Sequence, residues 1–114
     1  MRSKAPVLAV IVSLTVAASS AAAAGEASGP VSKILARQSD GLTYFYVEGV
    51  ATGKPACATR AYWMIKDEDS AAGKTILALV MSAQASGQRV TVHGSDTCTR
   101  WHDGEDVLWI QVGS

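Results

Sequence analysis

The sequence predicts a mainly β (α+β) domain in which five short strands form a small barrel and one helix joins the third strand to the fourth. Three observations predict this fold class. Residues 42–48 alternate along the chain and are rich in residues that favour strands. Residues 70–86 repeat apolar side chains at helical spacing. The pair Asp40-Gly41 is a strong hairpin signal just before the alternating segment.

The first 24 residues have the three parts of a cleaved export signal. A basic start leads into the apolar run 7–16, and a tract of small residues then ends at Ala24. The apolar run is too short to span a bilayer comfortably, and a retained membrane anchor is the alternative. We expect cleavage after Ala24 and a single mature domain over residues 25–114. We also expect a secreted or periplasmic protein with no membrane span after cleavage.

The two cysteines, Cys57 and Cys98, are the candidates for a covalent link. Export would take them to an oxidising compartment, where disulfides form and persist. A domain of about 90 residues buries little surface, so a covalent link would stabilise it. The alternatives are a metal pair or a catalytic thiol, but the cysteines form no Cys-x-x-Cys motif. We predict a disulfide between them.

The first half of the domain predicts a leader and three strands. Residues 25–30 are small and polar and predict a flexible leader, and residues 31–38 predict the first strand. Residues 56–65 predict the third strand after a loop at 49–55. In the second strand, alternation places Thr43, Phe45 and Val47 on one face and Leu42, Tyr44 and Tyr46 on the other.

Residues 70–86 predict the one helix. Asp69 or Ser70 can cap its first turn, and Gly87 stands where a helix commonly ends. The inward stripe is predicted to be Ala72, Ile76, Leu79, Val80 and Ala83.

The opposite face of the helix is poor in charge. It carries Ala78, Met81 and Ala85. One interpretation is that alanine is simply a good helix former. The other is that this face contacts another subunit, and we take these three residues as the candidate oligomer interface.

Residues 89–93 and 107–112 predict the fourth and fifth strands. Leu108, Ile110 and Val112 are expected on one face of the last strand and Trp109 on the other. The order of three strands, a helix and two strands is that of an OB-fold-like barrel, the oligonucleotide/oligosaccharide-binding type. Ten basic and ten acidic residues balance, and no basic stripe is present, so we expect no nucleic-acid partner.

Patterns for metal binding and catalysis are incomplete, so we expect no enzyme, no cofactor and no metal. Residues 67–69 begin like a calcium loop but lack its glycine and glutamate. The acids of residues 103–106 are interpreted as a solvated turn. Residues 93–96 include a histidine, a serine and an acid without a nucleophile elbow. A zinc site fits no established spacing, and its candidate ligands would be Cys98, His93, His102 and Asp103.

Four segments of the chain resemble the B subunits of the subtilase cytotoxin and typhoid toxin family. They are residues 28–31, 44–49, 56–58 and 87–90, and the likeness extends from Ser28 to about Cys98. Tyr46 stands where the family has a cysteine, so the family's disulfide arrangement is not carried over intact.

The resemblance implies a ring of five subunits with the helices at its centre, a sialylated glycan as ligand, and a separate A subunit as partner. It places a glycan-binding serine at Ser28, and strand alternation adds Tyr44 and Tyr46 as candidate neighbours. The predicted function is that of an exported, ring-forming, glycan-binding domain. The alternative is a periplasmic or secreted structural or interaction protein without a sugar site.

Overall fold

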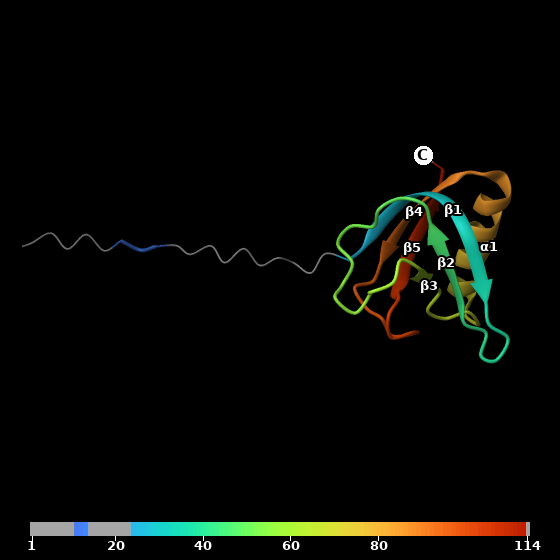
Figure 1. Ribbon diagram of the computed structural model, residues 1–114, viewed down its shortest axis with the longest axis horizontal. Helices are drawn as coiled ribbons and strands as arrows, with labels where there is room; N and C mark the ends of the chain where they lie inside the picture. The colour runs from blue at the N-terminus through green and yellow to red at the C-terminus, as the bar shows by residue number, and fades with distance from the viewer. Residues whose placement is uncertain (1–10, 14–23, 114) are drawn as a thin grey trace, which may run out of the picture.

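Five strands close into a barrel in the order β1-β2-β3-β5-β4, and the helix lies between β3 and β4 in the chain, as predicted (Figure 1). The computed structural model describes residues 11–13 and 24–113, so most of the expected export signal lies outside the described residues. Within the described part, no helix is both long and apolar enough to cross a membrane. The elements are β1 (Glu26–Ala36), β2 (Thr43–Val47), β3 (Trp63–Met64), α1 (Ala71–Ser86), β4 (Arg89–Gly94) and β5 (Glu105–Val112).

Strand β1 begins earlier than the sequence indicates. Residues 26–30 pair with β4, and residues 31–36 pair with β2 after a register shift between Val31 and Lys33. The predicted flexible leader is therefore wrong for these residues. Its small residues serve close packing, because a Cβ on Gly29 would lie 1.8 Å from the carbonyl oxygen of Glu48. Only glycine allows the two backbones to approach there.

Strand β2 follows the predicted alternation. Thr43 and Phe45 are buried, while Tyr44 and Tyr46 are partly exposed on the outer surface. Leu42 departs from the prediction, because it lies just before the strand and is buried. The inner face of β2 therefore contributes Phe45 to the core, and its outer face carries the two tyrosines.

The predicted third strand is mostly loop, and only Trp63 and Met64 form β3. Backbone groups of the preceding residues are used by other partners. The Lys54 ammonium donates to the carbonyl oxygens of Arg60 and Tyr62 at 3.1 and 3.2 Å. These contacts satisfy two carbonyl groups of the loop without a sheet ladder. The short β3 pairs antiparallel to β2 and parallel to β5.

Helix α1 has the predicted ends. The Ser70 side chain accepts from the Gly73 N–H at 2.9 Å, and Gly87 has a left-handed backbone with a φ of 71°. The inward face differs from the prediction, because Ala72 and Leu79 are exposed while Gly73, Val80 and Ala83 are buried.

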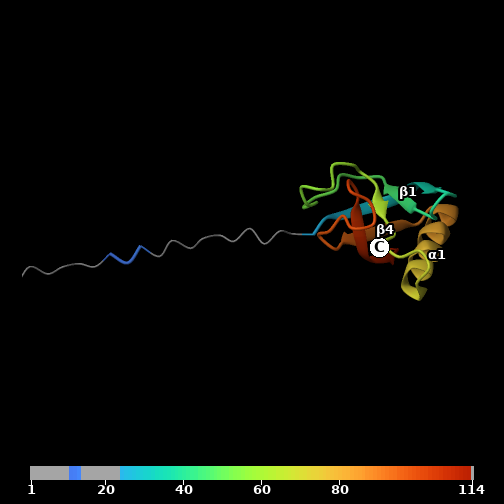
Figure 2. The same ribbon diagram turned by 90° about the horizontal axis from the view of Figure 1, so that it is seen from below.

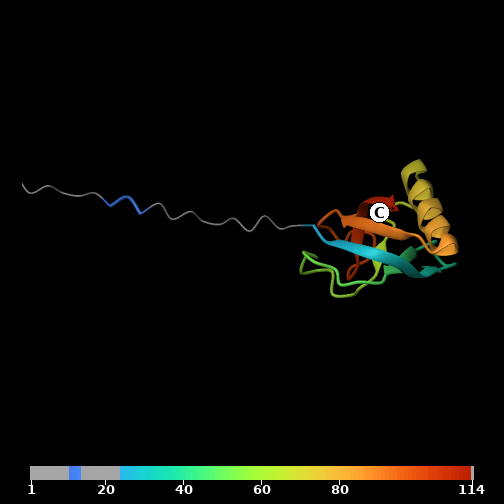
Figure 3. The same cartoon turned by 90° about the horizontal axis from the view of Figure 1, so that it is seen from above.

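Gly73 explains why the buried face of the helix differs from the predicted one. A Cβ there would lie 1.7 Å from the Asp67 carbonyl oxygen, so glycine lets the first turn pack directly on the preceding loop. Figures 2 and 3 show α1 at one end of the barrel, away from the end where β1 begins.

A register shift changes which side chains of β5 face inward. His93 pairs with Trp109, whereas the next residue, Gly94, pairs with Val107, so Leu108 is the additional residue of a bulge. Val107 is buried and Ile110 packs against the core, but Leu108 is 61% exposed. The prediction that Leu108 shares a face with Ile110 and Val112 is therefore wrong, and the prediction that Trp109 faces the other way from Ile110 is confirmed.

Two acids of the predicted solvated turn are fully buried. Glu105 and Asp106 both have 0% exposure. Asp106 accepts hydrogen bonds from the Thr97 hydroxyl, the Thr99 hydroxyl and N–H, and the Arg100 N–H at 2.6 to 3.1 Å. Burial by itself would raise the pKa of Asp106, but these hydrogen bonds outweigh it and lower that pKa. Asp106 thus organises the loop before β5.

A disulfide joins Cys57 to Cys98, as predicted. The two Cα atoms are 6.2 Å apart, and 41 positions separate the residues in the chain. The bond connects the loop before β3 to the loop before β5. Neither loop has a regular ladder, so the disulfide and the Asp106 hydrogen bonds together hold this part of the barrel surface.

Replacing both cysteines, with Cys57→Ala and Cys98→Ala, should lower the free energy of unfolding by about 4 kcal/mol, because the cross-link reduces the conformational entropy of the unfolded chain. Urea unfolding of the oxidised protein and the double variant measures the difference. Intact mass with and without reductant provides the control. Two free thiols in the native protein, or equal unfolding midpoints, would contradict the role of the bond.

Asp106→Asn should lower the free energy of unfolding by about 3 kcal/mol at pH 7, because an amide cannot accept all of these donors. The folded pKa of Asp106 is lowered, so its stabilisation is present above the unfolded pKa and is lost as the pH falls below about 4. Urea unfolding should show the difference between protein and variant shrinking on acidification. Asp96→Asn is the matched control on the same loop. A difference independent of pH would refute the role of the charge.

Candidate functional site

The outer surface of β1, β4 and β5 carries polar and aromatic side chains in two rows. Strand pairing sets His93 between Glu26 and Trp109 in one row, and Thr91 between its partners on β1 and β5 in the other. The residues between them on each strand are buried or pack against the core. We call this surface the serine face; it comprises Glu26, Ser28, Thr91, His93, Trp109 and Gln111.

Trp109 is the aromatic centre of the serine face. Its ring is stacked on the His93 ring with centroids 3.8 Å apart and planes at 23°, and the residue is 41% exposed. His93 Nε2 lies 3.3 Å from Glu26 Oε1 on the neighbouring strand. The tryptophan ring is therefore supported from one side.

Hydroxyl groups lie in the adjacent row. Ser28 Oγ and Thr91 Oγ1 are 3.0 Å apart, and one of them donates to the other. A hydroxyl has one donor and two acceptor sites, so this pair keeps hydrogen-bonding capacity for a ligand. A supported aromatic ring beside hydroxyls suits a ligand with one apolar and one polar surface, such as a sugar ring.

Tyr44 and Tyr46 lie in a different cluster with Tyr62, which the sequence did not place beside them. Ring centroids are 4.8 Å apart for Tyr44 and Tyr62 and 5.9 Å apart for Tyr46 and Tyr62. The Lys33 ammonium is 5.3 Å from the Tyr46 ring. Tyr62 donates to Asp103, and burial together with this contact raises the pKa of Tyr62 to about 12. These three tyrosines form the tyrosine face.

The structure does not bring Ser28 together with the two tyrosines. Tyr46 pairs with Lys33, five positions beyond Ser28 on β1, which is on the order of 15 Å along a strand. Ser28 instead neighbours Thr91 on β4, and it lies one row and two strands from Trp109 on β5. Sequence alternation placed Trp109 on the face opposite Ile110, but the pairing that brings Ser28 beside Thr91 joins residues 63 positions apart, which no local pattern indicates.

Two charged loops meet beside the tyrosine face. Arg37 lies 4.6 Å above the Trp101 ring, and hydrogen bonds from Arg37 hold the pKa of the Asp40 carboxyl well below its usual range. Arg100 binds Glu68 at 2.9 Å, and Glu68 also accepts from the Thr43 N–H. Glu68, one of the acids considered for a calcium loop, thus connects the loop of Arg100 to the barrel.

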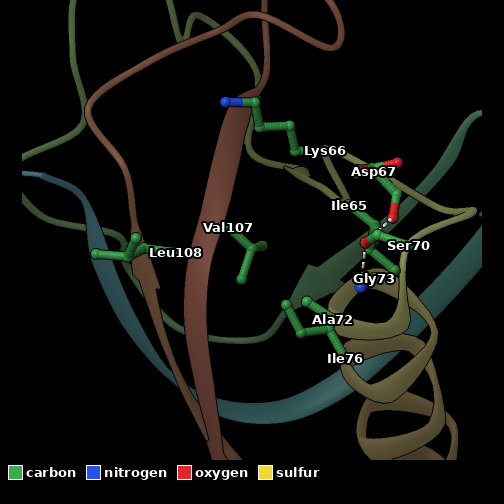
Figure 4. A pocket seen from close by; sticks show the side chains of 9 residues that line it. All are labelled: Ile65, Lys66, Asp67, Ser70, Ala72, Gly73, Ile76, Val107 and Leu108. Carbon is green, nitrogen blue, oxygen red and sulfur yellow. Dashed lines mark hydrogen bonds between the residues drawn. The ribbon is translucent and has the colours of Figure 1, made fainter.

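The helix face predicted as an interface is exposed. Ala78 and Ala85 are exposed, and Met81 is 55% exposed. Near the start of α1, an open groove of about 420 Å³ lies between the helix and β5 (Figure 4). Its apolar walls include Ile76, Val107 and Leu108. No local sequence pattern indicates this groove, because the bulge in β5 places Leu108 in its exposed wall.

The residues considered for catalysis or zinc binding have other contacts. Ser95 Oγ lies 2.6 Å from Thr97 Oγ1, whereas His93 contacts Glu26 and Trp109, so these contacts do not form a serine–histidine pair. Cys98 is bonded to Cys57 and is not a free thiolate ligand. Over the described ranges, no three His, Cys, Asp or Glu side chains are grouped as metal ligands would be.

Comparisons with protein-family models, characterised proteins and solved structures find no match to this chain. The resemblance to toxin B subunits therefore stays a prediction from short sequence segments, and function is inferred from the geometry of the barrel surface.

Proposed function

We propose that this chain is an exported glycan-binding module that holds a saccharide on the serine face. The observation that carries the proposal is the exposed Trp109 ring, stacked on His93 at 3.8 Å and one row from the paired hydroxyls of Ser28 and Thr91. The apolar face of a sugar ring packs on the indole, and the sugar hydroxyls bond to the polar row. The role of Ser28 agrees with the role implied by the family resemblance.

The serine face lies on the outside of the barrel, so a single site there buries little of its ligand. Such a site binds weakly, and several copies on one particle are needed for useful attachment to a glycan-bearing surface. We therefore include assembly in the proposal. The exposed helix face of Ala78, Met81 and Ala85 is the surface through which copies associate, as a ring of five in the arrangement implied by the resemblance.

A separate A subunit is the partner that a B-subunit role implies. The competing function is that of a structural or interaction protein, in which the serine face contacts protein and no sugar. Both functions place recognition on the barrel surface and assign no catalytic step to it. They differ in the ligand, and a glycan array distinguishes them.

Ser28→Ala and Trp109→Ala should each reduce glycan binding by about tenfold or more. The first removes a hydroxyl that bonds to the sugar, and the second removes the ring on which the sugar packs. Trp109→Phe should retain more binding than Trp109→Ala, since it keeps a ring. The measurement is binding of the protein, clustered on streptavidin, to an array of sialylated and neutral glycans. Thermal melting checks that each variant is folded.

Tyr46→Ala is the matched control, because it removes an aromatic ring from the tyrosine face on the same barrel. Loss of binding in Tyr46→Ala with retention in Trp109→Ala would move the site to the tyrosine face. No binding of the clustered, unmodified protein to any glycan would favour the structural or interaction function.

Met81→Glu should convert an assembled protein to monomers without unfolding the barrel, because it places a charge on an exposed apolar helix face that assembly would bury. Light scattering coupled to size exclusion measures the molar mass. Gln88→Glu, an exposed site just beyond the helix, adds the same charge as a control. A monomeric unmodified protein at tens of micromolar, roughly the range in which weak interfaces assemble, would remove assembly from the proposal.

A further inference from the structure

A buried carboxylate, Glu105, lies where β1 begins. Its side chain has 0% exposure, and Oε2 accepts hydrogen bonds from the N–H groups of Gly25 and Asp96, each at 3.0 Å. Oε1 is also buried and has no hydrogen-bond partner among the residues that the structure describes. A buried charge without a full set of partners is costly, so a hydrogen-bond donor to Glu105 Oε1 would stabilise the fold.

Lys54 is the cation near Glu105, but its ammonium is engaged elsewhere. Lys54 Nζ lies 4.1 Å above the Trp63 ring and donates to the carbonyl oxygens of Arg60 and Tyr62. The ion pairs of the described residues do not include one between Lys54 and Glu105. Burial lowers the pKa of Lys54, and the charge of Glu105 only partly opposes this effect. A second positive group beside Glu105 would complete the neutralisation of its carboxylate.

Gly25 is held firmly against Glu105. It is buried, and its carbonyl oxygen accepts from the Gly94 N–H at 2.8 Å. The next residue, Glu26, exchanges two backbone hydrogen bonds of 2.9 Å with Thr52. A Cβ on Gly25 would lie 2.2 Å from Glu105 Oε1, so the unpartnered oxygen is directly beside this glycine. Gly25 is thus a fixed part of the barrel, one residue after the expected cleavage point.

We propose that hydrolysis of the Ala24–Gly25 peptide bond creates an α-ammonium group that binds Glu105 and completes the barrel. A processing peptidase of the export machinery adds water across the bond. The carbon–nitrogen bond breaks, Ala24 takes the oxygen of the water and becomes a carboxylate, and the Gly25 nitrogen takes both hydrogens of the water and becomes an ammonium. The mature N-terminus then occupies a built site.

The change at the Gly25 nitrogen matches what Glu105 lacks. A peptide N–H is one neutral donor, and it is already used by Oε2. An ammonium at the same position has a positive charge and three donors, so it can serve Oε1 as well. Charge-assisted hydrogen bonds of this kind are roughly twice as strong as neutral ones. Removal of the leader therefore stabilises the domain, and the unprocessed chain carries an incompletely neutralised acid in its interior.

A two-by-two comparison of melting temperatures tests the proposal. The first pair is the chain from Gly25, which contains all the strands and the helix, and the same chain with Ala24 retained. The second pair carries Glu105→Gln. Retaining Ala24 should lower the melting temperature by on the order of 10 °C with Glu105 present and by much less with Glu105→Gln. Equal effects of Ala24 in both backgrounds would overturn the pairing.

A second measurement covers the case in which Glu105→Gln does not fold. The α-amine of the processed protein should react with an amine-acetylating reagent much more slowly in the folded protein than in urea, because it is buried and paired. Terminal sequencing of the exported full chain should give Gly25 as its first residue. Equal amine reactivity in the folded and unfolded protein, or a different first residue, would refute the proposal.

Discussion

The double pairing of β1 is the constraint on which the rest of the structure depends. Its first five residues pair with β4 and its later residues pair with β2, so one strand closes the barrel. The register shift after Val31 lets β1 turn from one neighbour to the other. The same division separates the two aromatic surfaces, since the serine face lies along the first part of β1 and the tyrosine face beside the second.

Two buried acids, Glu105 and Asp106, hold the loops of the barrel through hydrogen bonds. Asp106 gathers four hydrogen bonds from the loop at residues 97–100, and that loop is joined by the disulfide to the loop before β3. Glu105, the preceding residue, holds the start of β1 and the turn after β4 through the N–H groups of Gly25 and Asp96. Two successive carboxylates therefore position the start of β1 and the irregular segment between β4 and β5.

The proposed ligand site and the proposed assembly surface are on different elements. The serine face is built on three paired strands, which hold its side chains more rigidly than loops would. The exposed apolar face of α1 is at one end of the barrel, with the groove near its first turn (Figures 2 and 4). Association through the helix would leave the outer surfaces of β1, β4 and β5 available to ligand. This separation is what a multivalent binding protein requires.

The sequence by itself determined the features that depend on neighbouring residues: the order of the elements, the helix that ends at Gly87, the placement of Tyr44 and Tyr46 on the face opposite Phe45, and the disulfide, since the chain has only two cysteines. Tertiary structure alone decided that residues 26–30 form a strand, that Leu108 faces outward and that Glu105 and Asp106 are buried. It also decided that Ser28 contacts Thr91, on the strand between β1 and the strand of Trp109, and does not lie beside the tyrosines. The physical reason is that register shifts and strand partners involve residues far apart in the chain, and one shift in register reverses which side chains face the core.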